Sequence, residues 1–429
     1  MNPERNRGIS RRAFVKSAVA IGGTAALSAC LGRESPDLPQ GPDDLSTLPA
    51  RQHAWNDALA RDDHGNHVPP RHHVVRLLDY TGDGTPDDGE RDTVESALQT
   101  LERAYPRSNE GLLFTIGYTP AYFDRFDADR PAGLPDPEPL ANFEDPTPDT
   151  PDAAIHLASD YGSVLLAAEE ALLGEREEIN GVDVETDLAN VFAAADLADG
   201  GMARRTGFIG DGLPAENQDV DGIPDSEPVD EESPLFMGFE SGFAGTQATE
   251  DRVTIDEGAF AGGTTQHLSQ IRLHLTQWYE QDSREHREAT MFCPAHAEND
   301  RIEETGENLG ATSGVGACAD DAESDARQKG VVGHAQKNAR VREDGRPIIL
   351  RRDFDSTDGD EARVHFLSLQ SAIDDFVATR QAMNGDDLAE SGAVGQRTNN
   401  GILQYMSVER RGNYLLPPRA SRALPTPQG

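Results

Sequence analysis

The sequence predicts an α+β fold made of two similar halves. Short apolar runs alternate with segments of helical periodicity. The order strand, helix, strand, strand, helix is predicted for the first half and, with variations, again for the second. With 429 residues, the chain is long enough for two or three domains or for one large core. We therefore expect two ferredoxin-like halves, each an antiparallel sheet with helices packed on it.

The first half is expected to span residues 71–200. Val94, Leu98 and Leu101 recur at helical spacing, which predicts a helix over residues 92–104. Apolar runs predict the other elements, which are strands over 72–79, 112–118 and 153–159 and a second helix over 163–173.

The second half is expected to span residues 201–429 and to repeat this plan. Its predicted elements are a strand within 260–275, a helix over 283–291, strands over 348–352 and 364–369, a helix over 372–383 and a last strand over 402–408. Acidic or Gly/Ala-rich composition predicts loops over 127–150, 211–234 and 294–330.

The first thirty residues have the features of a targeting signal. Arg11 and Arg12 form a twin-arginine motif, a small-residue apolar stretch follows over residues 18–29, and Cys30 ends a sequence similar to a lipobox. We expect export by the twin-arginine pathway and a lipid anchor on Cys30, on the extracellular side of the cytoplasmic membrane. Residues 31–70 are rich in Pro, Asp and Gly and are expected to form a flexible tether.

The charge of the chain excludes one class of partner. Asp and Glu total 77 against 38 Lys and Arg, a formal net charge of −39, and only Lys16, Lys329 and Lys337 are lysines. This composition is typical of proteins adapted to molar salt, where charge repulsion is screened and acidic side chains keep the surface hydrated. No basic face is available to neutralise phosphates, so we expect no nucleic-acid partner.

The remaining candidate metal and cysteine sites are left open or disfavoured by their spacing. Cys293 and Cys318 could form one disulfide or be two separate thiols. No CxxC or Cys/His zinc spacing is evident, so a structural zinc site is not expected. The acidic stretches 79–90 and 219–230 lack the full spacing of a calcium loop, and we interpret them as solvated loops, with calcium binding left open.

Four stretches carry motifs in a fixed order along the chain. They are GLLFTIGYTPAYFD at 111–124, AAIHLASD at 153–160, FAGGTT with IRLHLTQW over 260–278, and GHAQKN at 333–338 with IILRR at 348–352. In this order they resemble the dye-decolorizing (DyP-type) peroxidases, haem proteins that include the deferrochelatase/peroxidases, over roughly residues 71–418. The resemblance implies a fold of the dimeric α+β barrel-like superfamily, haem b as cofactor, and reduction of hydrogen peroxide with oxidation of an electron donor.

The resemblance also implies roles for two residues of the last stretch. His334 would be the axial ligand of the haem iron, through a neutral imidazole. Arg351, 17 residues later, would stabilise the peroxide anion on the open side of the haem by its fixed charge. The second ring nitrogen of His334 would donate to a carboxylate, for which Asp374 and Asp375 are candidates.

The acid of the family's GxxDG motif is the point at which the sequence departs from the resemblance. GFIGDG at 207–212 has one extra residue and places Asp211 in that position, whereas GFESG at 238–242 has the right length but carries Ser241. We favour Asp211 as the proton shuttle. If Ser241 is the equivalent, proton transfer would rest on Arg351 and water, and turnover would be low.

Two other functions stay open at this point. The imperfect motif is also consistent with an exported haem- or iron-binding lipoprotein with little peroxidase turnover. The acidic stretches are consistent with a calcium-stabilised surface protein without haem. A homo-oligomer is neither predicted nor excluded.

Overall fold

The computed structural model describes residues 36–390 and 392–428. The predicted signal, the lipobox and Cys30 lie outside the described residues. None of the helices within the described ranges is long and apolar enough to cross a membrane.

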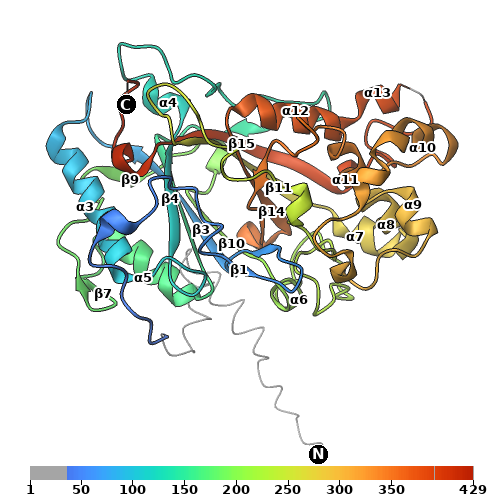
Figure 1. Cartoon of the computed structure of the whole chain (residues 1–429), viewed down its shortest axis with the longest axis horizontal. Helices are drawn as coiled ribbons and strands as arrows, with labels where there is room; N and C mark the ends of the chain where they lie inside the picture. The colour runs from blue at the N-terminus through green and yellow to red at the C-terminus, as the bar shows by residue number, and fades with distance from the viewer. Residues whose placement is uncertain (1–35, 391, 429) are drawn as a thin grey trace, which may run out of the picture.

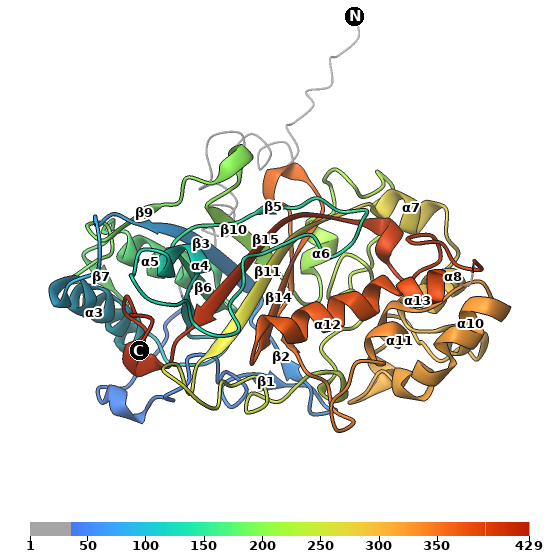
Figure 2. The same ribbon diagram turned by 90° about the horizontal axis from the view of Figure 1, so that it is seen from above.

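Eight antiparallel strands close into a single barrel (Figures 1 and 2). In order around the barrel they are β3 (His72–Tyr80), β6 (Ala153–Ser159), β4 (Leu113–Tyr118), β15 (Met406–Leu416), β11 (Thr264–Leu273), β14 (Arg363–Gln370), β13 (Phe354–Ser356) and β10 (Arg204–Phe208). β10 pairs with both β13 and β3, which closes the ring. The two predicted halves therefore share one sheet, and the α+β class and its barrel are confirmed.

Shorter strands extend the sheet or form small hairpins beside it. β9 (Phe192–Ala194) pairs with β3, β12 (Leu350–Arg351) with β14, and β5 (Thr147–Pro148) runs parallel to β15. The hairpins are β1 (Ala60–Arg61) with β2 (His67–Val68), and β7 (Glu178–Ile179) with β8 (Val182–Asp183).

Helices cover the outside of the barrel on two sides (Figure 1). The first half contributes α3 (Asp88–Ala104), α4 (Pro120–Phe123) and α5 (Gly162–Leu172). The second half contributes α6 (Leu213–Glu216), α7 (Leu275–Glu280), α8 (Arg284–Met291), α9 (Pro294–Glu298), α10 (Ala322–Gln328), α11 (His334–Asn338), α12 (Ile373–Asn384) and α13 (Asp386–Ala389). Asp87 and Glu90 form a capping box that starts α3 four residues before the predicted position.

The alternation of strand side chains divides the core into layers. On β3, Val74 and Leu78 pack against the helices of the first half, whereas Val75 and Leu77 point into the barrel. The barrel interior also holds Leu268 and Tyr414. A third cluster lies between the outer face of the second-half strands and the helices from α7 to α12.

Three predicted segments in the second half differ from the structure. The last strand, predicted over 402–408, begins later, because residues 403–405 form a 3₁₀ turn and the strand runs over 406–416. Two segments predicted as loops contain short helices, α6 in 211–234 and both α9 and α10 in 294–330. The other predicted helices and long strands are confirmed to within a few residues.

The expected flexible tether also differs from the structure in its described part. Trp55 and His53 are buried, and the Gln52 side chain hydrogen-bonds both the N–H and the C=O of Ile116 on β4. These contacts attach the segment to the barrel. Its Pro- and Asp-rich composition gave no signal of the five residues buried in the described part, which are Gln52, His53, Trp55, Asn66 and Pro70.

Candidate functional site

His334 is the first residue of α11, and its position is fixed by the residues around it. Gly333 caps the helix, and its N–H donates to Gln336 Oε1 at 3.0 Å. The Gln336 side chain donates to the Cys318 carbonyl and to Asp325 Oδ2, both at 2.7 Å. The Gln336 N–H donates to the Phe292 carbonyl at 3.1 Å. Hydrogen bonds thus attach the start of α11 to the end of α8 and to the segment 318–325.

The imidazole of His334 is enclosed and surrounded by positive charge. Burial, with the charges of Lys337, Arg351 and Arg380, lowers its pKa to about 3. Nε2 lies 3.2 Å from Asn338 Nδ2, and Nδ1 is buried with no partner among the described residues. The ring is therefore neutral near pH 7. Because the Asn338 amide nitrogen can only donate, Nε2 holds the lone pair and Nδ1 carries the hydrogen.

Arg351 lies on β12, on the face of the strand that looks toward the helices. Leu350 and Phe354 belong to the cluster inside the barrel, so Arg351 and Asp353 point outward. The Gln247 side chain fixes the Arg351 backbone, accepting from its N–H at 2.9 Å and donating to its carbonyl at 3.3 Å. Arg351 is near enough to His334 for its charge to lower the pKa of the imidazole, after burial and the charge of Lys337.

Asp353 is a candidate that the sequence reasoning missed. Its Oδ2 lies 3.9 Å from the Arg351 guanidinium, and its Oδ1 is buried without a hydrogen-bond partner among the described residues. Burial raises the pKa of Asp353, against the opposing effect of Arg351. The alternation of a strand would have placed residues 351 and 353 on one face, which is the signal that could have identified it.

The two acid positions weighed from the sequence lie beyond β10 and in the loop that follows. Asp211 is exposed in the turn after β10, and Arg71 donates to its backbone carbonyl at 3.1 Å. Ser241 is half-buried. Next to it, burial and the charge of Asp211 raise the pKa of Glu240 to about 7. Glu240 was not among the predicted site residues.

The expected carboxylate partner of His334 is not found at that position. Asp375 accepts from Ser371 Oγ at 3.0 Å, and the charged groups that shift its pKa are Glu343 and Arg252. Among the described residues, the charges that act on the His334 imidazole are all cationic. The structure therefore does not bring Asp374 or Asp375 to His334.

The residues around His334 fit an anionic metal-containing cofactor such as haem b. The Nε2 lone pair of the neutral imidazole, held only by the Asn338 amide at 3.2 Å, suits an axial metal ligand. Arg380 is ion-paired to Glu144 at 2.9 Å, but its Nε and Nη1 are buried with no partner among the described residues and suit a carboxylate of haem. Apolar side chains of the third cluster, including Val364 and Phe366 on the outer face of β14, remain half-buried. A cavity of about 180 Å³ is lined by Arg380 together with Glu144 and Asp145, and His334 is not among its lining residues.

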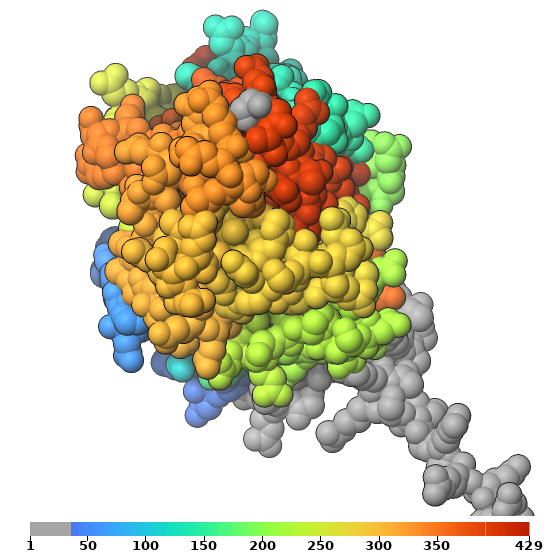
Figure 3. Space-filling model, turned by 90° about the vertical axis from the view of Figure 1, so that its right-hand side faces the viewer, coloured from blue at the N-terminus to red at the C-terminus, as the bar shows by residue number. Residues whose placement is uncertain are grey.

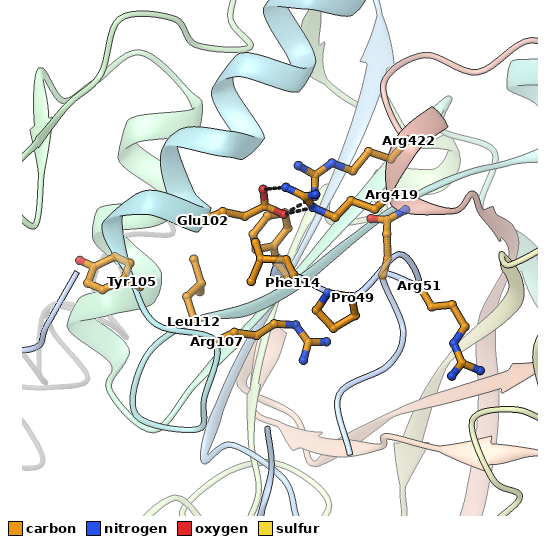
Figure 4. A pocket seen from close by; sticks show the side chains of 11 residues that line it. Pro49, Arg51, Glu102, Tyr105, Arg107, Leu112, Phe114, Arg419 and Arg422 are labelled. Carbon is orange, nitrogen blue, oxygen red and sulfur yellow. Dashed lines mark hydrogen bonds and ion pairs between the residues drawn. The ribbon is translucent and has the colours of Figure 1, made fainter. Parts of the chain in front are cut away.

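A second pocket lies beside helix α3 of the first half (Figure 4). Ion pairs cross it, and we call this set of pairs the ion-pair seam. The volume of the pocket is about 30 Å³, roughly that of one water molecule. Glu102 on α3 accepts from Arg419 and Arg422 across it, which attaches the C-terminal segment to the helix. Its lining comes from α3, β4 and the chain ends, so it does not belong to the site around His334.

Cys293 and Cys318 are joined by a disulfide bond, one of the two arrangements left open by the sequence. Together with His296 they form the one group of three or more metal-ligand side chains found among the described residues. Neither acidic stretch, 79–90 or 219–230, forms such a group there.

Comparison with solved structures defines the class of fold. A dye-decolorizing protein from V. cholerae has a TM-score of 0.52 and 12% identity, covering 85% of this chain and 97% of that one. A DypB variant of Rhodococcus jostii RHA1 in complex with heme has a TM-score of 0.52 and 15% identity, covering 87% and 98%. A putative DyP-type peroxidase from Shewanella oneidensis has a TM-score of 0.52 and 14% identity, covering 82% and 94%. The fold is that of the DyP-type peroxidases.

Comparison of the sequence places the chain more narrowly. Residues 70–418 match DUF7405, a family of unknown function, and the chain belongs to this family. No curated protein matches the sequence.

Proposed function

We propose that the protein is a haem-dependent peroxidase of the dye-decolorizing type, which reduces hydrogen peroxide and oxidises an electron donor. The observation that carries the proposal is the buried, neutral imidazole of His334, whose pKa Arg351 lowers, within a fold shared with DyP-type peroxidases. The resemblance in sequence over residues 71–418 supports it independently.

In this proposal each residue has a separate task. His334 holds the haem through its neutral imidazole, and the Arg380 guanidinium suits a haem carboxylate. Bound haem would supply the iron at which peroxide is activated and its O–O bond cleaved. Arg351 stabilises the negative charge that develops on the peroxide oxygens, because Gln247 fixes its backbone and Asp353 lies 3.9 Å from its guanidinium.

A carboxylate is needed to move the peroxide proton, and the structure offers Asp353 beside the sequence candidates. Asp353 shares the outward face with Arg351, whereas Asp211 is exposed in its turn. We therefore propose Asp353 as a proton carrier in addition to Asp211. Ser241 would leave proton transfer to Arg351 and water.

The proposal includes export by the twin-arginine pathway and a lipid anchor at Cys30. Its support is the order of motifs in residues 1–30. A Cys30→Ser variant should move the protein from the membrane fraction to the soluble exported fraction. Retention of the variant in the membrane fraction would overturn the anchor.

Haem binding is tested by titrating the purified protein with haemin and recording the Soret band. The wild type should give a band shifted from free haemin, at one equivalent. His334→Ala should change the position and intensity of that band, and the exposed His64→Ala should match the wild type. Identical spectra for wild type and His334→Ala would contradict the assignment of His334 as the ligand of the haem iron.

Turnover is tested by oxidation of a dye with hydrogen peroxide. Arg351→Leu should retain haem and lose about 10²–10³ in kcat. Asp353→Asn should lose about 10²–10⁴ if Asp353 carries the proton, and Asp211→Asn should do so if Asp211 does. Tight haem binding without turnover in the wild type would instead identify a haem carrier.

A further inference from the structure

The disulfide Cys293–Cys318 has a third group beside it that a structural crosslink does not need. His296 lies one helical turn after Cys293, and its Nδ1 is 2.9 Å from Cys293 Sγ and 4.0 Å from Cys318 Sγ. All three side chains are buried. The donor atoms lie within 4.8 Å of one another.

The protonation of His296 is fixed by its other nitrogen. Nε2 lies 2.8 Å from the Ser313 carbonyl, which can only accept, so Nε2 carries the hydrogen. In the neutral ring Nδ1 then has a lone pair that points at the two sulfurs. A disulfide has no hydrogen to donate, so in the oxidised protein this buried nitrogen has no donor. A thiol or a metal ion in the same place would satisfy it.

We propose that Cys293, His296 and Cys318 form a binding site for a thiophilic divalent cation such as Zn²⁺ when the disulfide is reduced. Zinc–sulfur bonds of about 2.3 Å and zinc–nitrogen bonds of about 2.0 Å in a tetrahedron place the nitrogen about 3.5 Å from each sulfur. The two measured nitrogen–sulfur distances, 2.9 and 4.0 Å, lie on either side of this value. The hydrogen bond from Nε2 to a carbonyl is the outer contact that orients metal-bound histidines.

Opening of the disulfide requires an external reductant. A phosphine and one water molecule reduce the disulfide to two thiols and yield the phosphine oxide. Zn²⁺ then replaces the two thiol protons, which leave to solvent. The residue that orients His296 also carries a hydroxyl, Ser313 Oγ, that is buried with no partner among the described residues.

Hydrogen bonds link the cluster of Cys293, His296 and Cys318 to the start of α11. Gln336 donates to the carbonyls of Cys318 and Phe292, the second of which precedes Cys293. The segments from 275 to 330 cover the cluster and form the surface at this end of the molecule, yellow to orange in Figure 3. A bound cation would therefore hold the same two segments together that the disulfide holds in the oxidised protein.

The test uses the full chain with Cys30→Ser, so that Cys293 and Cys318 are its only thiols. The protein is reduced with tris(2-carboxyethyl)phosphine, the reductant is removed without oxygen, and Co²⁺ is added as an optical probe of the zinc site. One equivalent should produce thiolate-to-cobalt charge-transfer absorption that Zn²⁺ displaces. The unreduced protein should show none.

The matched variant is His296→Gln, because a glutamine can still donate to the Ser313 carbonyl but lacks the Nδ1 ligand. It should weaken Co²⁺ binding at least about 100-fold, the upper end of what losing an outer contact costs. His286→Gln, on the neighbouring helix α8, should bind like the parent. Cys293→Ser should abolish the charge-transfer band.

Three outcomes would overturn the proposal. The first is a folded, reduced protein without thiolate-to-cobalt absorption, and the second is equal affinity of His296→Gln and the parent. The third is a reduced protein that stays unfolded by circular dichroism with and without Zn²⁺, because a cation that binds this site must restore the fold.

Discussion

Replacement of Gly333 by alanine is the sharpest test of how α11 positions His334. Gly333 has φ −83° and ψ 148°, a conformation open to any residue, so only space requires glycine there. A Cβ at this position would lie 1.8 Å from the Phe292 carbonyl oxygen and 2.4 Å from its carbon. These are backbone atoms at the end of α8, which cannot rotate away as a side chain would.

The size of the effect follows from that contact. Real Cβ atoms come no nearer than 3.0 Å, against 1.8 Å here, so the segments must separate by about 1.2 Å. This separation would also stretch the Gln336–Phe292 hydrogen bond, which is 3.1 Å long. Overpacking of this kind costs about 1–3 kcal/mol. Because His334 is the next residue, a displacement near 1 Å should also cost about 10²-fold in peroxidase turnover.

The assay pairs chemical denaturation with haem titration and dye oxidation. Gly316→Ala is the matched control, since Gly316 has no atom within 4 Å of an added Cβ and no left-handed φ. It should change the free energy of unfolding by no more than about 1 kcal/mol, in the stabilising direction. If Gly333→Ala proved as stable as the parent and bound haem with the same Soret band, the account of how α11 is held would be wrong.

Two further predictions concern the pH dependence and the ion-pair seam. Burial lowers the pKa of His267 to about 3, so the folded protein keeps it neutral while the unfolded chain, with a pKa of about 6.5, takes up a proton. Stability contributed by this group is full above pH 6.5 and falls by about 2 kcal/mol at pH 5, and His267→Gln should remove that part of the loss whereas the exposed His64→Gln should not. Glu102→Gln should lower the free energy of unfolding by about 3 kcal/mol, because it leaves two arginines beside a neutral group. The control Asp251→Asn removes a carboxylate that is 86% exposed and should lower it by less than about 1 kcal/mol. Equal losses in the two variants, measured by thermal or chemical unfolding, would contradict the role of the ion pairs of Glu102.

The elements with plain apolar periodicity could be predicted from the sequence, and the last strand could not. β6 is buried along its whole length, and His156 is the one residue in it that is neither apolar nor small. β15 carries Arg410, Arg411 and Asn413, which reads as a polar segment. Those arginines are buried because Asp149 and Glu144, from the long loop before β6, supply ion pairs at 2.7 and 2.9 Å. Partners 260 residues away leave no trace in local periodicity.

The site divides in the same way. The sequence motifs identified His334 and Arg351, and in the structure the charge of Arg351 helps to lower the pKa of His334. Asp353 was missed although strand alternation puts it beside Arg351. His296 was missed because its sulfur neighbours lie 3 and 22 residues away, and only the fold of the 294–330 segment brings Cys318 back to Cys293. Neighbours within one strand could be predicted from the sequence, whereas neighbours brought together by irregular segments could not.

The net charge of −39 describes the surface and conceals the opposite sign at the site. Lys337 is one of only three lysines in the chain, and it is fully buried, with the oxygens of Asn400 and Met383 as its hydrogen-bond partners. Burial and the charges of Arg380 and Arg340 lower its pKa well below the usual value, with only weak opposition from Asp386 and Asp387. A chain with twice as many acids as bases could neutralise such groups, and Glu144 does pair with Arg380 at 2.9 Å, but among the described residues only cationic groups shift the pKa of the His334 imidazole. An excess of positive charge at the imidazole suits an anionic cofactor, because the carboxylates of the cofactor would balance it.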